Sequence, residues 1–140
     1  MSIFASETST TIPIPFDVPQ TVTIRKLTGR EVEQAQAAHR DSFLGSSPRL
    51  WSATFRKALE KGATDPDVQK ALADPLLGYD RYTVAKVGAI AWSYPRPVGP
   101  EAVDDLCDEA LDFFATEILR LTKPALFLTD EEREAARKNV

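Results

Sequence analysis

The segment from Pro100 to Leu121 sorts acidic and apolar side chains onto two opposite faces of one predicted helix. Both kinds of residue recur at steps of three and four, the spacing that lines up side chains on one face of a helix. No basic residue interrupts the acidic face between Glu101 and Leu119. A helix of this kind buries its apolar stripe and presents its carboxylates outward, so we interpret it as a binding element. The acidic residues are Glu101, Asp104, Asp105, Asp108, Glu109 and Asp112, and the apolar ones are Val103, Leu106, Cys107, Ala110, Phe113, Phe114, Ile118 and Leu121.

The chain has 140 residues, 43% of them hydrophobic, which is enough for one globular domain. Its net charge of −4 and its scattered Lys and Arg residues argue against a nucleic-acid partner. The single cysteine, Cys107, excludes an internal disulfide and suits a reducing cytoplasm. The N-terminus lacks the pattern of a secretory signal, and every apolar run is shorter than the about 20 residues that span a bilayer. We therefore expect a soluble protein with no membrane partner.

The first part of the chain predicts an arm followed by two strands. Residues 1–11 are rich in Ser and Thr, so we expect a flexible N-terminal arm. Alternating apolar residues at 12–16 and at 22–24 predict two short strands joined near 17–20. Prolines at 13 and 15 confine the first strand to an edge of the sheet or to an extended arm, because proline lacks a backbone N–H.

Capping signals and apolar spacing predict the helices that follow. Thr28 and Glu31 form a capping box that opens a helix to about Phe43. Further helices are expected at 50–62 and 65–72. The segment 80–94 is apolar nearly all round, and we favour a central core helix there, with a strand at 84–90 as the alternative.

The predicted fold is mainly α, with about five helices and a short N-terminal β-hairpin or extended arm. The domain plan is a flexible arm at 1–11, one mostly helical domain with N-terminal strands at 12–128, and a charged tail helix at 129–140. A second capping box, from Thr129 to Glu132, opens that tail helix.

The residues most able to carry catalysis have simpler structural interpretations. His39 is the only histidine, and its helical setting beside charged residues favours a surface or boundary position. Cys107 falls on an apolar stripe, which favours a buried structural thiol over a nucleophile. No phosphate loop, dinucleotide fingerprint or metal-ligand cluster is present in the sequence. We therefore expect neither an enzyme nor a bound cofactor or metal.

The remaining candidates are partner-binding residues. Asp104, Asp108 and Asp112 stand four residues apart, a spacing that a hard cation could use, but a straight helix lacks the ligand loop of a calcium site. A solvated face or a basic partner surface explains these carboxylates better. The large aromatic residues fit helical core stripes, and any that are exposed indicate an interface. The candidate contact residues are Trp51, Phe55, Asp104, Asp108, Asp112, Phe113 and Phe114.

Three stretches of the sequence together resemble the tail assembly chaperones of long-tailed bacteriophages. They read IPIPFDVPQTVTIRKLTGREVEQAQ, AKVGAIAWSY and VGPEAVDDLCDEALDFFATEILRLTKPALFLTDEEREAARKN. The likeness runs from about Ile12 to Asn139 in the same order, and it lies in the general pattern, since the family has no single diagnostic motif. Prophage-derived equivalents share this pattern.

The resemblance implies a mostly helical protein that acts in the host cytoplasm and is absent from the mature virion. It implies binding to the tape measure protein during tail assembly, with the tail-tube protein as a second partner; a homo-oligomer is also compatible. The family often makes a longer product by ribosomal frameshifting near the end of the short form. The alternative function is a structural virion component, such as a head-tail connector or a tail-completion protein. A regulatory protein-binding module with no phage role is a third interpretation.

Overall fold

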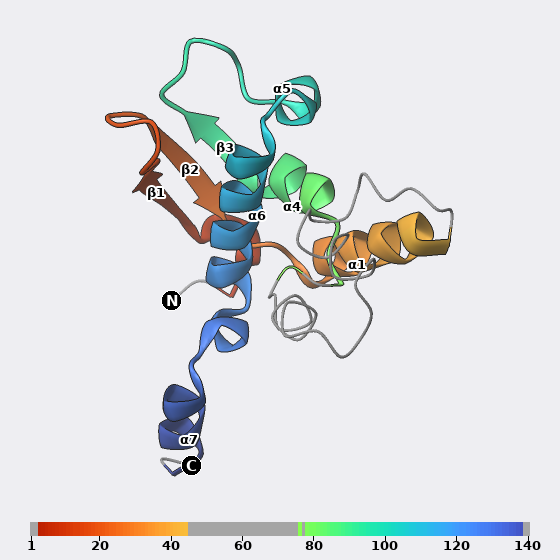
Figure 1. The fold of residues 1–140 in the computed structure, drawn as a ribbon, viewed down its shortest axis with the longest axis vertical. Helices are drawn as coiled ribbons and strands as arrows, with labels where there is room; N and C mark the ends of the chain where they lie inside the picture. The colour runs from red at the N-terminus through yellow and green to blue at the C-terminus, as the bar shows by residue number, and fades with distance from the viewer. Residues whose placement is uncertain (1–2, 45–75, 77, 139–140) are drawn as a thin grey trace, which may run out of the picture.

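The computed structural model describes residues 3–44, 76 and 78–138, which form a three-stranded antiparallel sheet with helices packed on it (Figure 1). The fold is mixed α/β, so the expectation of a mainly helical protein is met only in part. The helices expected at 50–62 and 65–72 lie outside the described residues. In chain order the elements are η1 (Ala5–Glu7), β1 (Ser9–Pro13), β2 (Thr21–Arg25), α1 (Gly29–Leu44), α4 (Arg81–Gly88), β3 (Ala89–Trp92), α5 (Pro100–Asp104), α6 (Asp108–Thr122), η3 (Pro124–Phe127) and α7 (Asp130–Lys138).

The predicted hairpin is confirmed, with β1 at the edge of the sheet and β2 at its centre. The strand begins earlier than expected, because Ser9 pairs with Arg25 and Thr11 with Thr23. Residues 9–11 therefore belong to the sheet, and their assignment to a flexible arm was wrong. The chain turns back through a loop in which the N–H of Ile14 donates to the carbonyl of Gln20 at 2.9 Å. Phe16 belongs to this loop, which Figure 1 shows at the upper end of the sheet.

The segment 80–94 is not one helix. Asp80 caps the N-terminus of α4 by accepting from the N–H groups of Tyr82 and Thr83, and the helix ends at Gly88. Residues 89–92 then become β3, which pairs antiparallel with β2. Val22 and Ile24 bury one face of β2, and the backbone groups of this central strand need partners on both sides. The short run of small and β-branched residues after Gly88 supplies those partners.

The acidic segment is also divided, into α5 and α6. At the end of α5 the hydrogen bonds tighten, and Leu106 N–H donates to Val103 at 3.1 Å. Cys107 then takes an extended conformation as the N-cap of α6, and its side chain is exposed. The expected buried thiol was therefore wrong. The break lets α5 pack against α4 while α6 runs along the sheet.

The core lies where α6 packs against β2 on one side and α4 on the other (Figure 1). Its largest side chains come from the hairpin loop, from β2 and from the helices α4, α5 and α6. Gly88 on α4 sits against Ile118 on α6, so the two helices approach closely. The fully buried large residues are Ile14, Val22, Ile24, Val84, Val103, Leu111, Phe114, Ile118 and Leu119.

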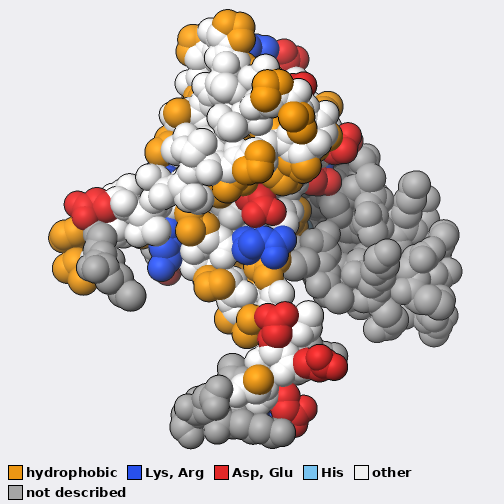
Figure 2. All heavy atoms as spheres, turned by 90° about the vertical axis from the view of Figure 1, so that its left-hand side faces the viewer, with side chains coloured by type: hydrophobic (Ala, Val, Ile, Leu, Met, Phe, Trp, Pro, Cys, Tyr) orange, Lys and Arg blue, Asp and Glu red, His pale blue; other side chains and the backbone are white. Residues whose placement is uncertain are grey.

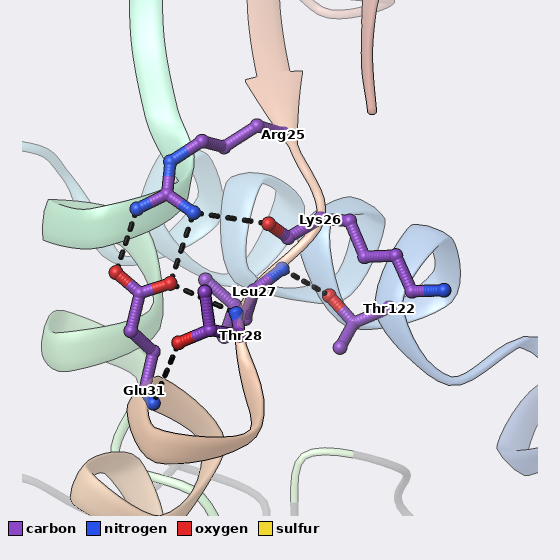
Figure 3. Close-up of polar contacts among 6 residues, drawn as sticks. All are labelled: Arg25, Lys26, Leu27, Thr28, Glu31 and Thr122. Atoms are coloured by element: carbon purple, nitrogen blue, oxygen red, sulfur yellow. Dashed lines mark hydrogen bonds and ion pairs between the residues drawn. The ribbon is translucent and has the colours of Figure 1, made fainter. Parts of the chain in front are cut away.

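The predicted capping box at Thr28 forms and joins β2 to α1 (Figure 3). The N–H of Thr28 donates to the Glu31 carboxylate at 2.9 Å, and the N–H of Glu31 donates to the Thr28 hydroxyl at 3.2 Å. Arg25 adds a two-pronged ion pair to Glu31, with contacts of 2.9 and 2.6 Å. The Thr122 hydroxyl accepts from the N–H of Leu27 at 3.1 Å, which ties the end of α6 to the same junction.

The second capping box is also confirmed, since the Thr129 hydroxyl accepts from the N–H of Glu132 at 3.1 Å and α7 follows. Figure 1 shows α7 projecting from the end of the molecule opposite the hairpin loop. No helix in the described part of the chain is long and apolar enough to cross a membrane.

Gly88→Ala tests the contact between α4 and α6. A Cβ at this position would lie 2.5 Å from Ile118 Cγ2 and 2.7 Å from Cδ1. We expect the free energy of unfolding in urea to fall by about 1–3 kcal/mol, as for other overpacked cores. Gly29→Ala is the matched control, because a Cβ there meets no atom within 4 Å. Equal stability of the two variants would contradict this packing.

Glu31→Gln tests the ion pair at the strand–helix junction. The hydrogen bond from Arg25 lowers the pKa of Glu31 below its ordinary value of 4.5. A carboxyl with a depressed folded-state pKa stabilises the fold above its unfolded pKa and loses this contribution as pH falls through the folded pKa. We expect Glu31→Gln to lower the free energy of unfolding by about 1–3 kcal/mol at pH 7.

Glutamine can keep the cap geometry, so the difference between wild type and Glu31→Gln reports mainly the charge. This difference should shrink as pH falls below 4.5. Glu33→Gln, on the exposed face of α1, is the control and should leave stability nearly unchanged. If the difference in the free energy of unfolding between wild type and Glu31→Gln stays constant as the pH falls from 7 to well below 4.5, the ion pair contributes nothing to stability.

Candidate functional site

Three of the predicted partner-binding carboxylates form ion pairs within the chain. Asp104 contacts Lys86 at 2.8 Å, and Asp108 and Asp112 contact Arg81 at 3.1 and 2.7 Å. Both cations lie on α4, a helix that precedes the acidic segment in the chain and is separated from it by β3 and a connector. The two cations of a neighbouring helix therefore offset most of the charge of these three carboxylates.

Arg81 is the buried member of this network, with a side chain only 4% exposed. Burial acts to lower its pKa, but the hydrogen bond to Asp112 and the charges of Asp112 and Asp108 outweigh that effect, so the pKa of Arg81 is raised. Its Nε atom is buried and has no hydrogen-bond partner among the described residues. The two aspartates thus offset the cost of burying the guanidinium charge.

The predicted aromatic contact residues have different positions. Phe114 is 1% exposed and belongs to the core, while Phe113 is half-buried and packs edge-on against Phe16 at a ring distance of 5.5 Å. Trp51 and Phe55 lie outside the described residues. Because it is buried, Phe114 can contact a ligand only where its side chain forms part of the lining of a groove.

The two candidates for catalysis lie on different elements of the described structure. His39 is half-buried on α1, where burial lowers its pKa and the charge of Asp80 opposes this effect. Cys107 is exposed at the start of α6. Within the described residues, no group of three or more His, Cys, Asp or Glu side chains could hold a metal ion.

A groove of about 290 Å³ opens at the end of the molecule that carries the hairpin loop. Its walls come from that loop, from the end of β3 and the connector after it, and from α5 and α6. In Figure 2 apolar side chains gather on this upper part of the molecule. We call it the aromatic groove; it is lined by Phe16, Trp92, Tyr94, Pro95, Arg96, Ala102, Asp105, Leu106, Ala110 and Phe114.

The polar groups of the aromatic groove already bond to one another. The Tyr94 hydroxyl donates to Asp17 at 2.6 Å, the Trp92 indole N–H donates to the carbonyl of Arg96, and Arg96 donates to Asp105 at 2.6 Å. Loss of solvent, together with the hydrogen bond to Asp17, raises the pKa of Tyr94 to about 12. These side chains are thus held in place, and the surface they leave is mostly apolar.

An apolar groove with occupied polar groups favours an aliphatic or aromatic side chain as its ligand. A polar substrate would lose its hydrogen bonds to water on entry and gain few in return. The exposed fraction of Phe16, 42%, places a large aromatic ring at the entrance. Aromatic anchors of this kind are common at protein interfaces.

Sequence reasoning missed Phe16, Tyr94 and Arg96, because they lie in loops rather than on a helical stripe. A signal was present in the prolines beside them, at 15, 95 and 97, which mark extended and stiff segments. The sheet then brings the two loops together, since β2 pairs with both β1 and β3.

Comparison with protein-family models, with characterised proteins and with solved structures gives no match. The aromatic groove and the ion-pair network are therefore interpreted from their own geometry.

Asp112→Asn tests the ion-pair network. The change leaves the buried Arg81 guanidinium with only the weaker contact to Asp108, so we expect the free energy of unfolding to fall by about 1–3 kcal/mol. Asp41→Asn, at an exposed position on α1, should change it by less than about 0.5 kcal/mol. Chemical unfolding at pH 7 measures both, and equal effects would mean that Asp112 acts as a solvated surface charge.

Proposed function

We propose that the chain is a tail assembly chaperone of the kind found in long-tailed bacteriophages, which binds the tape measure protein and keeps it soluble during tail assembly. In this proposal it acts in the host cytoplasm, is not an enzyme and leaves the assembly before the virion matures. The client identity comes from the resemblance of the sequence, and the mode of binding comes from the aromatic groove.

The aromatic groove is the observation that carries the proposal. Its polar groups are bonded to one another, and its walls are aromatic and aliphatic, so it suits an apolar side chain of a protein partner. Phe16 lies at its entrance, and Val18 on the same loop is 77% exposed. Exposed apolar groups at one end of a small protein are typical of an interaction surface.

A tape measure protein is a suitable client on physical grounds. Such proteins are very long and helical, with apolar stripes that tend to aggregate before the tail tube surrounds them. Helices with apolar stripes bind in grooves through side chains spaced three or four residues apart. The aromatic groove can receive one such anchor, while the charged surface around it keeps the complex soluble.

A structural virion component is the second candidate, and a different feature favours it. Ile3 and Phe4 are 90% and 61% exposed near the N-terminus, next to the edge strand β1. Exposed apolar arms and sheet edges suit permanent contacts between subunits of a ring. The protein content of purified particles separates this candidate from the chaperone.

Co-expression with the tape-measure candidate from the neighbouring gene tests the proposal. We expect the two proteins to co-purify and the soluble fraction of the tape measure protein to rise. Phe16→Ala should weaken retention of the client by about five- to thirtyfold, the usual effect of truncating a hot-spot aromatic residue. The comparison measures how much client a tagged chaperone retains as an untagged competitor is added.

Leu126→Ala is the control, because Leu126 is an exposed apolar residue of η3 that does not line the aromatic groove. It should retain the client like the wild type. If the client does not co-purify and the chain is found in purified virions, the chain is a structural component and the chaperone proposal fails.

A further inference from the structure

The outer edge of β1 has no neighbouring strand in the described part of the chain, because β1 pairs only with β2 (Figure 1). The N–H of Lys26 donates to the Thr8 carbonyl at 2.8 Å, and the N–H of Ile14 donates to the Gln20 carbonyl at 2.9 Å. Hydrogen-bonded and non-hydrogen-bonded positions alternate along an antiparallel pair, so the even-numbered residues of β1 bond to β2. The backbone groups of its odd-numbered residues therefore point away from the sheet.

These outward groups form an edge that is able to pair. Ser9 and Thr11 each present an N–H and a carbonyl there, and Pro13 presents a carbonyl alone. No backbone hydrogen bond from another described segment reaches them. Proteins commonly protect such an edge with charged side chains, because it is a template for a strand of another chain. All residues from Thr8 to Ile14 are uncharged, so this protection is absent.

We propose that β1 pairs with β1 of a second copy of this chain across a two-fold axis at Thr11. In this register Thr11 donates to and accepts from the partner's Thr11, and Ser9 donates to the carbonyl of the partner's Pro13. Both outward N–H groups of the strand then have an acceptor. The missing N–H of Pro13 falls at the ends of the contact. Two three-stranded sheets become one continuous antiparallel sheet.

The edge suits a copy of itself because its charge and its spacing are both compatible with two-fold symmetry. The axis places Thr11 opposite its own copy, so a charged residue at this position would meet a like charge, which destabilises a strand pair. The uncharged edge avoids this repulsion, although the whole chain carries a net charge of −4. Ser9 and Pro13 stand at equal distances in sequence from Thr11, so the antiparallel pair matches along the whole strand.

The side chains of β1 also fit this pairing. Thr10 and Ile12 share the face of their buried partners in β2, yet Thr10 is exposed and Ile12 only half-buried, because α6 packs on β2. A second copy places the partner's Thr10 opposite Ile12, which removes more apolar surface from water. On the other face, the Thr11 hydroxyl bonds to that of Thr23 at 2.8 Å, and the dimer continues this row of threonines across the axis.

Sedimentation velocity of the full-length protein tests the inference. The strand contributes five residues per copy, whereas a standard interface uses about 20–30 residues a side. We therefore expect a dimer that dissociates on dilution in roughly the micromolar range. Hydrogen exchange on the wild type adds a local readout. The N–H of Thr11 should exchange more slowly as the protein concentration rises, because it becomes hydrogen-bonded only in the dimer.

Thr11→Pro removes the central outward N–H and keeps the bonds between β1 and β2, since proline is tolerated where the N–H faces away from the sheet. We expect the dissociation constant of the dimer to rise at least about tenfold, because the hydrogen bonds on the axis are lost. Thr11→Val is the matched control. It keeps the N–H and a β-branched side chain, and loses only the hydroxyl contact to Thr23, so it should dimerise within about threefold of the wild type.

Thr11→Lys and Thr11→Glu test the symmetry of the contact. Each variant alone places like charges opposite each other and should dimerise more weakly than the wild type. An equal mixture of the two should form a heterodimer about threefold or more tighter than either homodimer in low salt. Circular dichroism and urea unfolding show whether each variant is folded, and recovery of pairing in the mixture requires two folded chains.

A chain that stays monomeric over the whole concentration range would overturn the inference. A dimer that Thr11→Pro leaves intact would also overturn it, because the contact would then lie on another surface. If Thr11→Pro does not fold, the mixture decides: a heterodimer no tighter than the homodimers contradicts pairing at Thr11. The proposed function is judged separately, since the Phe16-dependent retention of the tape measure protein concerns the aromatic groove and not the edge of β1.

Discussion

Burial of α6 between β2 and α4 is the contact on which the rest of the structure depends. Leu111, Ile118 and Leu119 are fully buried there, and Gly88 lets α4 approach Ile118 closely. Removing this much apolar surface from water stabilises the domain. It also fixes the acidic face of α6 relative to α4, and the position of the α5–α6 turn relative to the hairpin loop.

The ion-pair network and the aromatic groove are both consequences of this packing. Because α4 lies beside the start of α6, its two cations pair with three carboxylates of the acidic face and offset most of their charge. Because the sheet places the hairpin loop and the β3 connector on the same end, Phe16 and Tyr94 meet the α5–α6 turn. The groove that results is mostly apolar, and such a surface suits a protein ligand better than a small polar one.

Local sequence signals predicted those features whose partners are close in the chain. The capping boxes at Thr28 and Thr129 form as expected, because each needs only residues three positions apart. The edge position of β1 followed from Pro13, which cannot donate to a ladder. Predictions from local signals were wrong where the conformation depends on residues distant in the chain. Residues 89–92 form a strand because they pair with β2. Cys107 is exposed because the acidic segment breaks into two helices before it.

The sequence by itself determined the amphipathic character of α6, the hairpin and the start points of α1 and α7, since periodicity, proline and caps act within a few residues. The candidate site, in contrast, depends on residues that are distant in the chain. Asp104, Asp108 and Asp112 were identified as outward-facing charges, but their cations come from α4. Phe16, Trp92 and Leu106 lie far apart in the chain, and only the sheet pairing and the α5–α6 turn bring them to one groove. Only the tertiary structure decided which charges are neutralised and which apolar groups stay open, because both depend on which side chains meet across the fold.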